Sequence, residues 1–229
     1  MPKYERYQDY VFKDGRLVGE FEEMYRDFDN PWRQLHIESF ASDKAVILNL
    51  LQRLRAAFGV ARVLEIGCGL GQFTKRIHDL GLDSIGMDVS PTAIDKAKSL
   101  YSGPRFAQGD ISDGGLISDL APDVIVMCEV TWYVLEKLPG FLDTLRNRLP
   151  NAFLLHSLST YAADEQKVGR DYFTTGDDIR RYFAMTYLEW GEVCLHNGQC
   201  RAYFLGTWDS ARAAAWTYKE TYKADDELY

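Results

Sequence analysis

A glycine-rich turn at residues 67–71 constrains this chain of 229 residues more than any other feature. Residues 63–66 (Val-Leu-Glu-Ile) are mostly apolar and favour a β-strand, and Gly67, Gly69 and Gly71 follow before a helical pattern begins. This pattern predicts a buried strand, a tight turn whose backbone can approach a ligand closely, and a helix N-terminus directed at the same point. We therefore expect a ligand at the carboxyl end of this strand.

The spacing of the glycines differs from the fingerprint that binds a dinucleotide. That fingerprint reads Gly-x-Gly-x-x-Gly and seats a pyrophosphate on the helix, whereas this turn reads Gly-x-Gly-x-Gly and has Gln72 where the third glycine would fall. Glu65, just before the turn, would repel a pyrophosphate but would suit an ammonium group. Asp88 closes the next expected strand and is well placed to bind a ribose diol.

The turn, the acid before it and the acid one strand later together resemble motif I and the ribose-binding acid of the class I S-adenosylmethionine-dependent methyltransferases. The resemblance implies S-adenosylmethionine as the cofactor. It also implies that Asp110 accepts a hydrogen bond from the adenine amine while Ile111 packs on the ring, although Asp110 could instead be a turn residue that binds its own backbone. The cofactor-binding residues expected on this basis are Glu65, Gly67, Cys68, Gly69, Gly71, Asp88, Val89, Asp110, Ile111 and Glu129.

Strands alternate with helices after the turn, which predicts a parallel sheet covered by helices on both faces. The expected strands are residues 63–66, 84–88, 104–108, 123–129 and 152–156. The expected helices are residues 42–57, 72–80, 91–100, 138–149 and 176–184. Asn197-Gly198 then predicts a β-hairpin of residues 186–194 and 200–208. We expect an α/β, Rossmann-like class I methyltransferase sheet of five parallel strands plus a terminal antiparallel hairpin, an ending that an NAD-binding sheet does not usually have.

The chain divides into three expected segments: an N-terminal hairpin and helix (1–41), the methyltransferase domain (42–208) and a peripheral C-terminal tail (209–229). In the first segment, Asp14-Gly15 predicts a hairpin turn between strands at residues 10–12 and 17–19. The aromatic side chains of this segment suit either a clasp that packs on the domain or a lid that closes over cofactor and acceptor.

The composition limits the classes of partner. The net charge of −8, without a run of lysine or arginine, disfavours nucleic acid and an acidic membrane surface. No apolar segment is long enough to span a membrane, and the polar N-terminus does not lead into the apolar core of a secretory signal. We expect a cytoplasmic protein, a monomer or a homodimer, that acts on a small molecule.

The four cysteines are Cys68, Cys128, Cys194 and Cys200. They have neither the spacing nor the histidine partners of a metal site, so we expect reduced thiols and no bound metal. A two-residue turn at Asn197-Gly198 would pair Cys194 with Arg201, and the two cysteines of the hairpin would not face each other.

Polar residues that follow strands are the candidates for the chemistry, because ligands bind at the carboxyl ends of the strands in open α/β sheets. Glu129 could take a proton from the acceptor, position an ammonium group or brace the methionine end of the cofactor; a carboxylate bonded to the backbone is the alternative. Tyr133 and His156 are the other catalytic candidates, although a lone histidine at the end of a buried strand is more often structural. The substrate-binding candidates, for which core packing is the alternative, are Tyr25, Trp32, Trp132 and Tyr133.

Further segments resemble the NodS-like branch of the family, whose members N-methylate an amino sugar. They are Asp29-Asn30-Pro31-Trp32-Arg33, the glycine turn, and Trp132-Tyr133-Val134-Leu135. The resemblance implies a methyltransferase that acts on nitrogen or oxygen of a small polar, sugar-derived acceptor. The alternatives are an NAD-dependent oxidoreductase of Rossmann type and a non-catalytic S-adenosylmethionine-binding protein.

Overall fold

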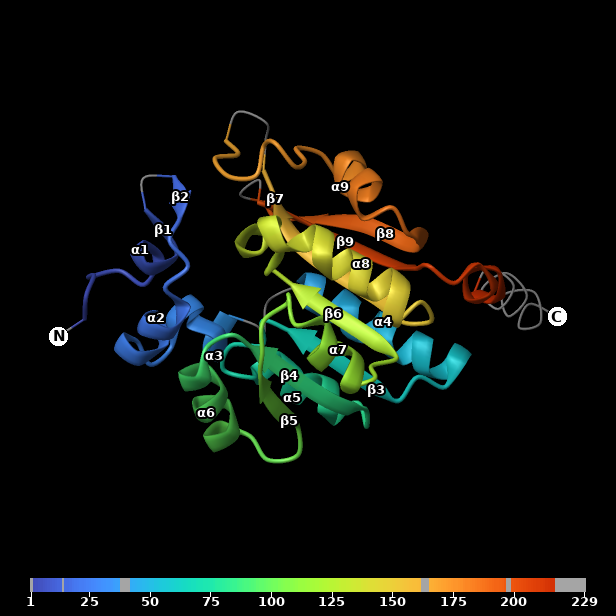
Figure 1. Ribbon diagram of the computed structural model, residues 1–229, viewed down its shortest axis with the longest axis horizontal. Helices are drawn as coiled ribbons and strands as arrows, with labels where there is room; N and C mark the ends of the chain where they lie inside the picture. Colours follow the sequence, from blue (N-terminus) through green and yellow to red (C-terminus); the bar gives the residue numbers. More distant parts are fainter. Residues whose placement is uncertain (1, 14, 38–41, 162–164, 197–198, 217–229) are drawn as a thin grey trace.

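Seven strands form one sheet in the order β5-β4-β3-β6-β7-β9-β8 in the computed structural model, which describes residues 2–13, 15–37, 42–161, 165–196 and 199–216 (Figure 1). The first five strands in this order run parallel, whereas β9 runs antiparallel to its neighbours β7 and β8. The strands are β3 (Arg62–Ile66), β4 (Asp83–Asp88), β5 (Arg105–Gln108), β6 (Val124–Cys128), β7 (Phe153–Thr160), β8 (Thr186–Cys194) and β9 (Cys200–Thr207). The predicted sheet of five parallel strands with a terminal antiparallel hairpin is confirmed.

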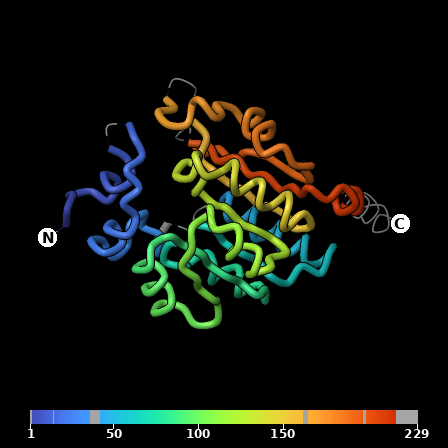
Figure 2. The backbone as a smooth tube through the Cα atoms, in the orientation of Figure 1, coloured from blue at the N-terminus to red at the C-terminus, as the bar shows by residue number. Residues whose placement is uncertain are grey.

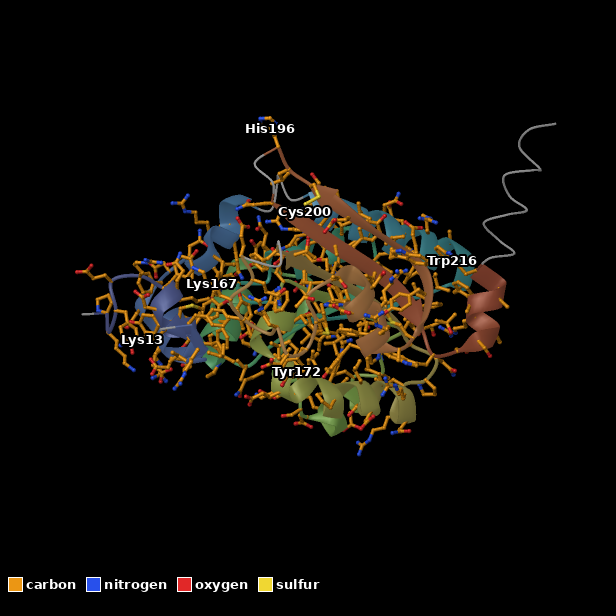
Figure 3. The ribbon with its side chains drawn as sticks, turned by 90° about the horizontal axis from the view of Figure 1, so that it is seen from above. Lys13, Lys167, Tyr172, His196, Cys200 and Trp216 are labelled. Atoms are coloured by element: carbon orange, nitrogen blue, oxygen red, sulfur yellow. A yellow bond between two sulfur atoms is a disulfide. The ribbon has the colours of Figure 1, made fainter. Side chains whose placement is uncertain are left out.

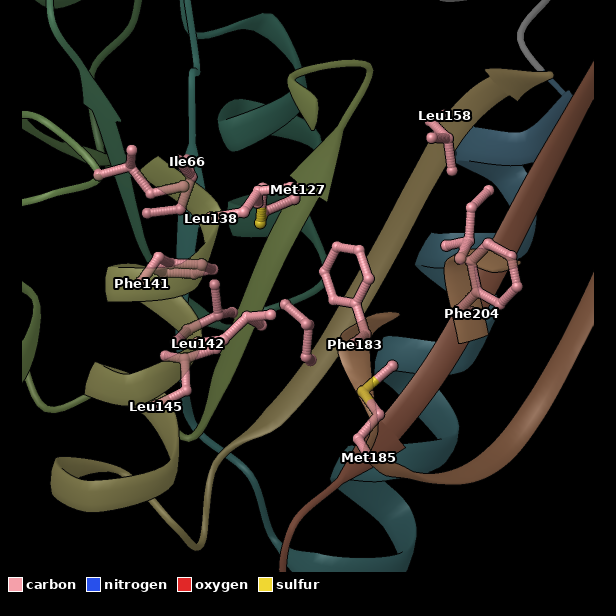
Figure 4. Close-up of a cluster of buried hydrophobic side chains, with 14 of the residues drawn as sticks. Ile66, Met127, Leu138, Phe141, Leu142, Leu145, Leu158, Phe183, Met185 and Phe204 are labelled. Carbon is pink, nitrogen blue, oxygen red and sulfur yellow. The ribbon is translucent and has the colours of Figure 1, made fainter. Parts of the chain in front are cut away.

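Helices cover both faces of the sheet, because the strand side chains point into two separate apolar cores. The helices are α4 (Ser42–Phe58), α5 (Gln72–Asp79), α6 (Pro91–Leu100), α7 (Gly114–Asp119), α8 (Leu138–Arg148) and α9 (Gly176–Phe183). One core packs α7, α8 and α9 on the sheet, and the other packs α4 and α5. Figure 4 shows Phe141, Leu142 and Leu145 of α8 turned toward the sheet in the first core. Every side chain of β6 is buried, as a central parallel strand requires.

Local sequence determines where several of these elements begin and end. As predicted, Ser90 caps α6, and its hydroxyl accepts a hydrogen bond from Ala93 N at 3.0 Å. Helix α7 was not predicted; it begins after Asp113, whose carboxylate accepts from Leu116 N at 2.9 Å. Strand β7 continues to Thr160, beyond the predicted end at residue 156, because β9 pairs with it along its whole length.

The N-terminal arm, residues 2–37, packs at the carboxyl ends of the parallel strands. In Figures 1 and 2 it lies on the side of the molecule toward which β6 points. Its elements are α1 (Gln8–Val11), β1 (Phe12–Lys13), β2 (Arg16–Leu17), α2 (Phe21–Asp27), a 3-10 helix (Pro31–Arg33) and α3 (Gln34–Ile37). The predicted hairpin is present but shorter, because Tyr10 and Val11 belong to α1 and are fully buried in the apolar cluster of the arm. Asp14 of the predicted turn lies outside the described residues.

Hydrogen bonds of two charged side chains attach the arm to α6. Glu22 in α2 accepts hydrogen bonds from Thr92 N at 3.1 Å and Thr92 Oγ1 at 2.7 Å. Its charge therefore lies at the N-terminus of α6, where the helix dipole stabilises an anion. Lys96 Nζ donates to the carbonyl oxygens of Tyr25 at 2.7 Å and Phe28 at 3.0 Å. Hydrogen bonds therefore join the arm to the domain in addition to the apolar contacts with Leu70 and Ala93.

The described part of the chain ends in a helical segment, residues 210–216, that follows β9. Trp216 belongs to the same apolar core as α4, and its ring stacks on that of Phe58 with 6.2 Å between the centroids. The rest of the predicted tail lies outside the described residues. Within the part of the chain that the structure describes, no helix combines the length and apolar character needed to cross a membrane.

The end of the β8–β9 hairpin differs from the prediction. Cys194 pairs with Cys200, and a disulfide bond joins the two residues; Figure 3 shows this yellow bond beside Cys200. Leu195 N donates to Gln199 O at 2.8 Å, so the connection is one residue longer than a two-residue turn. The extra residue shifts the register by one and brings the two cysteines opposite each other. The predicted reduced state is therefore wrong for this pair, whereas Cys68 and Cys128 are free and buried.

Because two of the four cysteines are joined, the unfolded, unreduced protein should expose two titratable thiols. The double variant Cys194→Ser/Cys200→Ser should lose about 2 kcal/mol of unfolding free energy, the chain-entropy value for so short a loop. Thiol titration in denaturant and urea unfolding measure the two quantities, and reductant should not alter the stability of the double variant. Four thiols without reductant would show that this disulfide does not form.

Candidate active site

A cavity of about 480 Å³ lies where the strands β3, β4 and β6 end. The glycine turn and the strand ends form its floor, and the N-terminal arm closes it from outside. The predicted site residues that line it are Tyr25, Trp32, Glu65, Gly67, Cys68, Asp88, Val89, Asp110, Ile111, Glu129 and Tyr133. Gly69 and Gly71 belong to the same turn without lining the cavity.

The glycine turn is held against the end of β4 by backbone hydrogen bonds. Gly67 N and Cys68 N both donate to Met87 O, at 2.7 and 3.0 Å. Gly67 and Gly69 have φ values of 70° and 52°, which disfavour any residue with a Cβ. A Cβ on Gly69 would also lie 2.6 Å from the hydroxyl of Tyr25. The arm therefore covers Gly69, which explains why this glycine does not line the cavity.

Asp88 stands at the end of β4 with a side chain that is 7% exposed. Its Oδ2 accepts from Gly69 N at 2.9 Å, and its Oδ1 accepts from Ser90 N at 3.0 Å. Burial raises the pKa of this carboxyl, and the backbone donors partly oppose the rise. The carboxylate lines the cavity, and its acceptor oxygens suit the hydroxyls of a ribose.

Glu65 is buried in the floor of the cavity, one strand residue before the turn. The hydroxyl of Thr74 donates to its carboxylate. Burial raises the pKa of Glu65 to about 7, against the opposing effects of Thr74 and the Lys44 ammonium. A positively charged ligand in the cavity would favour the ionised form.

Asp110 and Ile111 follow β5 at the opposite side of the cavity from Glu129. Asp110 accepts hydrogen bonds from Ser112 N at 2.9 Å and from Ser112 Oγ at 2.6 Å, and it pairs with Lys137 Nζ at 2.5 Å. The turn-forming role weighed for Asp110 is thus present, and the residue lines the cavity as well. Ile111 is buried, and Val89 is 43% exposed at the rim.

Glu129 directly follows β6, and its φ of 61° is unusual for a residue with a side chain. Its Oε2 accepts from Ser159 N at 3.1 Å and Ser159 Oγ at 2.8 Å, and its Oε1 accepts from Arg201 Nε at 3.1 Å. Burial raises the pKa of Glu129, while Ser159 and Arg201 lower it. These partners hold the carboxylate in one position against the cavity wall.

Aromatic rings form the outer wall of the cavity. Tyr133 lies 5.7 Å from Phe21 and 5.6 Å from Trp32, measured between ring centroids. Burial raises the pKa of the Tyr133 phenol far above its usual value, so its hydroxyl stays protonated near neutral pH. Phe21, like Trp32, belongs to the arm and lines the cavity.

Two predicted residues do not reach the cavity. His156 is fully buried, and its ring packs 4.5 Å from the ring of Phe183. Burial lowers the pKa of His156 to about 3, and its Nε2 bonds the hydroxyl of Thr131. Trp132 donates its indole N–H to Ser159 O at 3.0 Å and packs against Phe173. The structure therefore corrects both assignments, because these side chains belong to the core.

Four charged residues of the cavity wall were not predicted: Asp43, Lys44, Lys137 and Arg201. Lys137 pairs with the predicted Asp110. Asp43 and Lys44 lie in the first turn of α4. That helix leads into β3 and runs antiparallel to it, so its N-terminus reaches the same edge as the strand ends. The position of Asp43 and Lys44 could therefore have been predicted from the sequence. The position of Arg201 depends on the register of β9, which could not be predicted from the sequence.

Within the described residues, the cluster that offers several metal-ligand atoms is Glu192, Cys194 and Cys200. Its two sulfur atoms are joined in the disulfide, so they are not available as thiolates.

Comparison with known proteins identifies the family. Residues 38–205 match a family model described as a methyltransferase domain, and because this match covers more than half of the chain, the protein belongs to that family. Nodulation protein S of Rhizobium tropici is 30% identical over 107 residues, which span 46% of this chain and 44% of that protein, less than half the length of this curated relative. The family predicted from the glycine turn is confirmed.

Solved structures share the fold. The N-methyltransferase NodS from Bradyrhizobium japonicum WM9, in complex with S-adenosyl-L-homocysteine, matches with a TM-score of 0.54 and 22% identity over 82% of this chain and 97% of that chain. An S-adenosylmethionine-dependent methyltransferase from Clostridium acetobutylicum ATCC 824 matches with a TM-score of 0.56 and 13% identity over 78% of this chain and 98% of that chain. At these identities the likeness supports the fold alone.

The raised pKa of Glu65 predicts a pH-dependent difference in stability between the wild type and Glu65→Gln. Below pH 4.5 the carboxyl is protonated in both the folded and the unfolded state. As the pH rises to about 7, the unfolded state ionises first, so the free energy of unfolding falls. The variant lacks this loss, and its stability relative to the wild type should rise by up to about 3 kcal/mol between about pH 5 and pH 8.

Urea unfolding without cofactor at the two pH values measures this difference. Gln at position 65 can still accept the hydrogen bond from Thr74, so the variant tests the charge and not the shape. A difference that does not change with pH would show that Glu65 titrates normally.

Proposed function

We propose that this protein transfers the methyl group of S-adenosylmethionine to a nitrogen or oxygen of a small polar, sugar-derived acceptor. The observation that supports this best is that one cavity joins the glycine turn and Asp88 to Glu129 and to the aromatic wall of the arm. The first pair suits a nucleoside cofactor, and the second suits an acceptor beyond it. Because the chain belongs to the methyltransferase family, we set aside the alternative of an NAD-dependent oxidoreductase.

The residues present fit the cofactor. Asp88 offers a carboxylate to the ribose, Ile111 offers an apolar surface to the adenine, and buried Glu65 offers negative charge to the ammonium and sulfonium groups. The cofactor supplies a methyl group that is already activated by the positive sulfur. The chain then has to bind, align and shield the two reactants, and alignment alone can supply a large part of the rate.

The acceptor assignment rests on the arm and on the size of the site. Phe21, Trp32 and Tyr133 line the cavity with neighbouring aromatic rings, a surface that suits a sugar ring. The name of the relative NodS, an N-methyltransferase, agrees with a nitrogen acceptor. A wall closed on several sides favours a small molecule over a protein or nucleic acid chain.

Glu129 is the residue that we assign to the acceptor proton. It lines the cavity, its position is fixed by Ser159 and Arg201, and burial raises its pKa. A carboxylate with a raised pKa is a better proton acceptor than an exposed one. Tyr133 serves the wall, since its phenol stays protonated.

Titration calorimetry tests the cofactor. S-adenosylhomocysteine should bind, and NAD should not. Asp88→Asn should weaken the binding of S-adenosylhomocysteine by about 1.5–3 kcal/mol, the range for a hydrogen bond to a charged group. The dissociation constant should therefore rise by roughly tenfold to a hundredfold. Asp143→Asn, at an exposed position of α8 outside the cavity, is the matched control and should not change the affinity. Micromolar binding of NAD, with none of S-adenosylhomocysteine, would reverse the assignment.

A tryptophan substitution tests whether the arm takes part in the reaction. Trp32→Ala should lower kcat/KM for any accepted amino sugar by about tenfold or more, because a misplaced acceptor loses alignment. The dissociation constant of S-adenosylhomocysteine should change little. Trp190→Ala, at a tryptophan that is 50% exposed and outside the cavity, is the control. Equal kinetics for both variants would make the arm a packing clasp, and no turnover with any acceptor would favour the non-catalytic alternative.

A further inference from the structure

Asp43 carries a buried carboxylate oxygen that accepts no hydrogen bond from the described residues. The residue is 1% exposed, lies in the first turn of α4 and lines the cavity. Its Oδ2 accepts from Ser157 Oγ at 3.2 Å, whereas Oδ1 has no hydrogen-bond partner. Arg201 Nη1 lies 3.8 Å from Oδ1, an ion pair without a hydrogen bond. A buried, unbonded carboxylate oxygen is costly unless a ligand donates to it.

Arg201 is shared between two carboxylates. Its Nε donates to Glu129 Oε1 at 3.1 Å, and its Nη1 faces Asp43 Oδ1. Lys44 also lines the cavity and interacts with Glu65 and Glu129. Asp43 and Glu129 thus share one guanidinium, and Asp43 Oδ1 still lacks a hydrogen-bond donor among the described residues.

Asp43 lies apart from the positions expected for the ribose and the adenine of the cofactor. The strand order places Asp88 and Asp110 at the ends of β4 and β5, on one side of β3. Glu129 follows β6, and Ser157 and Arg201 belong to β7 and β9, on the other side of β3. The ribose and adenine positions thus lie in one half of the cavity, and Asp43 lies in the half left for the acceptor.

We propose that Asp43, positioned by Ser157 and Arg201, binds a basic amine on the acceptor and selects aminated acceptors over neutral ones. The inference rests on the proposed function, because it treats this half of the cavity as the acceptor site. A hydroxyl group could donate a hydrogen bond to the free oxygen. An ammonium group donates a hydrogen bond and also carries the charge opposite to the carboxylate, so it is favoured over a hydroxyl.

Paired probes that differ in one group test the proposal on the wild type with saturating S-adenosylhomocysteine. Glucosamine is compared with glucose, and ethanolamine with ethylene glycol, by titration calorimetry or ligand-observed NMR. At least one amine should bind about tenfold or more tightly than its neutral partner, the effect of one charge-assisted hydrogen bond. Turnover of the same four probes with S-adenosylmethionine should follow the same preference.

Asp43→Asn then removes the charge and keeps the shape. The variant should bind the amine about tenfold to a hundredfold more weakly, and its affinity for the neutral partner should change little. Its affinity for S-adenosylhomocysteine should change by less than about twofold. Asp143→Asn again serves as the control. The wild-type comparison does not depend on the variant and stands if Asp43→Asn fails to fold.

Three outcomes would overturn the assignment: neutral probes that bind as tightly as the amines, amines that neither bind nor accept a methyl group, or an amine preference that Asp43→Asn retains. Each of these can occur while S-adenosylhomocysteine binds normally. If the wild type does not bind S-adenosylhomocysteine, the proposed function itself fails, and this inference fails with it.

Discussion

The hydrogen bonds between the glycine turn and the end of β4 are the constraint on which the rest of the site depends. Gly67 and Cys68 donate to Met87 O, and Gly69 donates to the carboxylate of Asp88. These bonds fix the turn in the left-handed conformations that only glycine adopts at low cost. They also supply part of the solvation that Asp88 loses on burial. On the outer side of the turn, Gln34 Oε1 accepts from Leu70 N at 2.8 Å, so the arm is placed by the same backbone.

The buried acids around the cavity are best explained together, by the charge of the ligand that they face. Burial raises the pKa values of Glu65, Asp88 and Glu129, which means that each is less stable ionised here than in water. A fold does not need three such carboxylates around one space, and packing alone would favour apolar residues. A ligand with positive charge would restore what the acids lose. S-adenosylmethionine carries a sulfonium and an ammonium, so the electrostatics of the cavity agree with the cofactor that the family implies.

Local patterns predicted the fold and the cofactor half of the site, because backbone geometry there follows from adjacent residues. The three glycines and the acid at the end of β4 needed no distant contact to be recognised. Register and strand length were harder. One extra loop residue placed Cys194 opposite Cys200, and four further residues of β7 turned His156 from a strand end into a core residue beside Phe183. Arg201 reaches Glu129 only through the pairing of β7 with β9, a contact between residues far apart in the sequence.

The contacts of the arm fall into two sets, and this division explains how one segment can serve both as a clasp and as a wall. Glu22 bonds α6, and Lys96 of α6 bonds the backbone of α2, all outside the cavity. Phe21 and Trp32 line the cavity and take no part in those bonds. Hydrogen bonds to charged groups contribute about 1.5–3 kcal/mol each, more than the contacts of an aromatic pair beyond its buried area. We infer that the first set holds the arm in place, so that the aromatic set can adapt to an acceptor without releasing the segment.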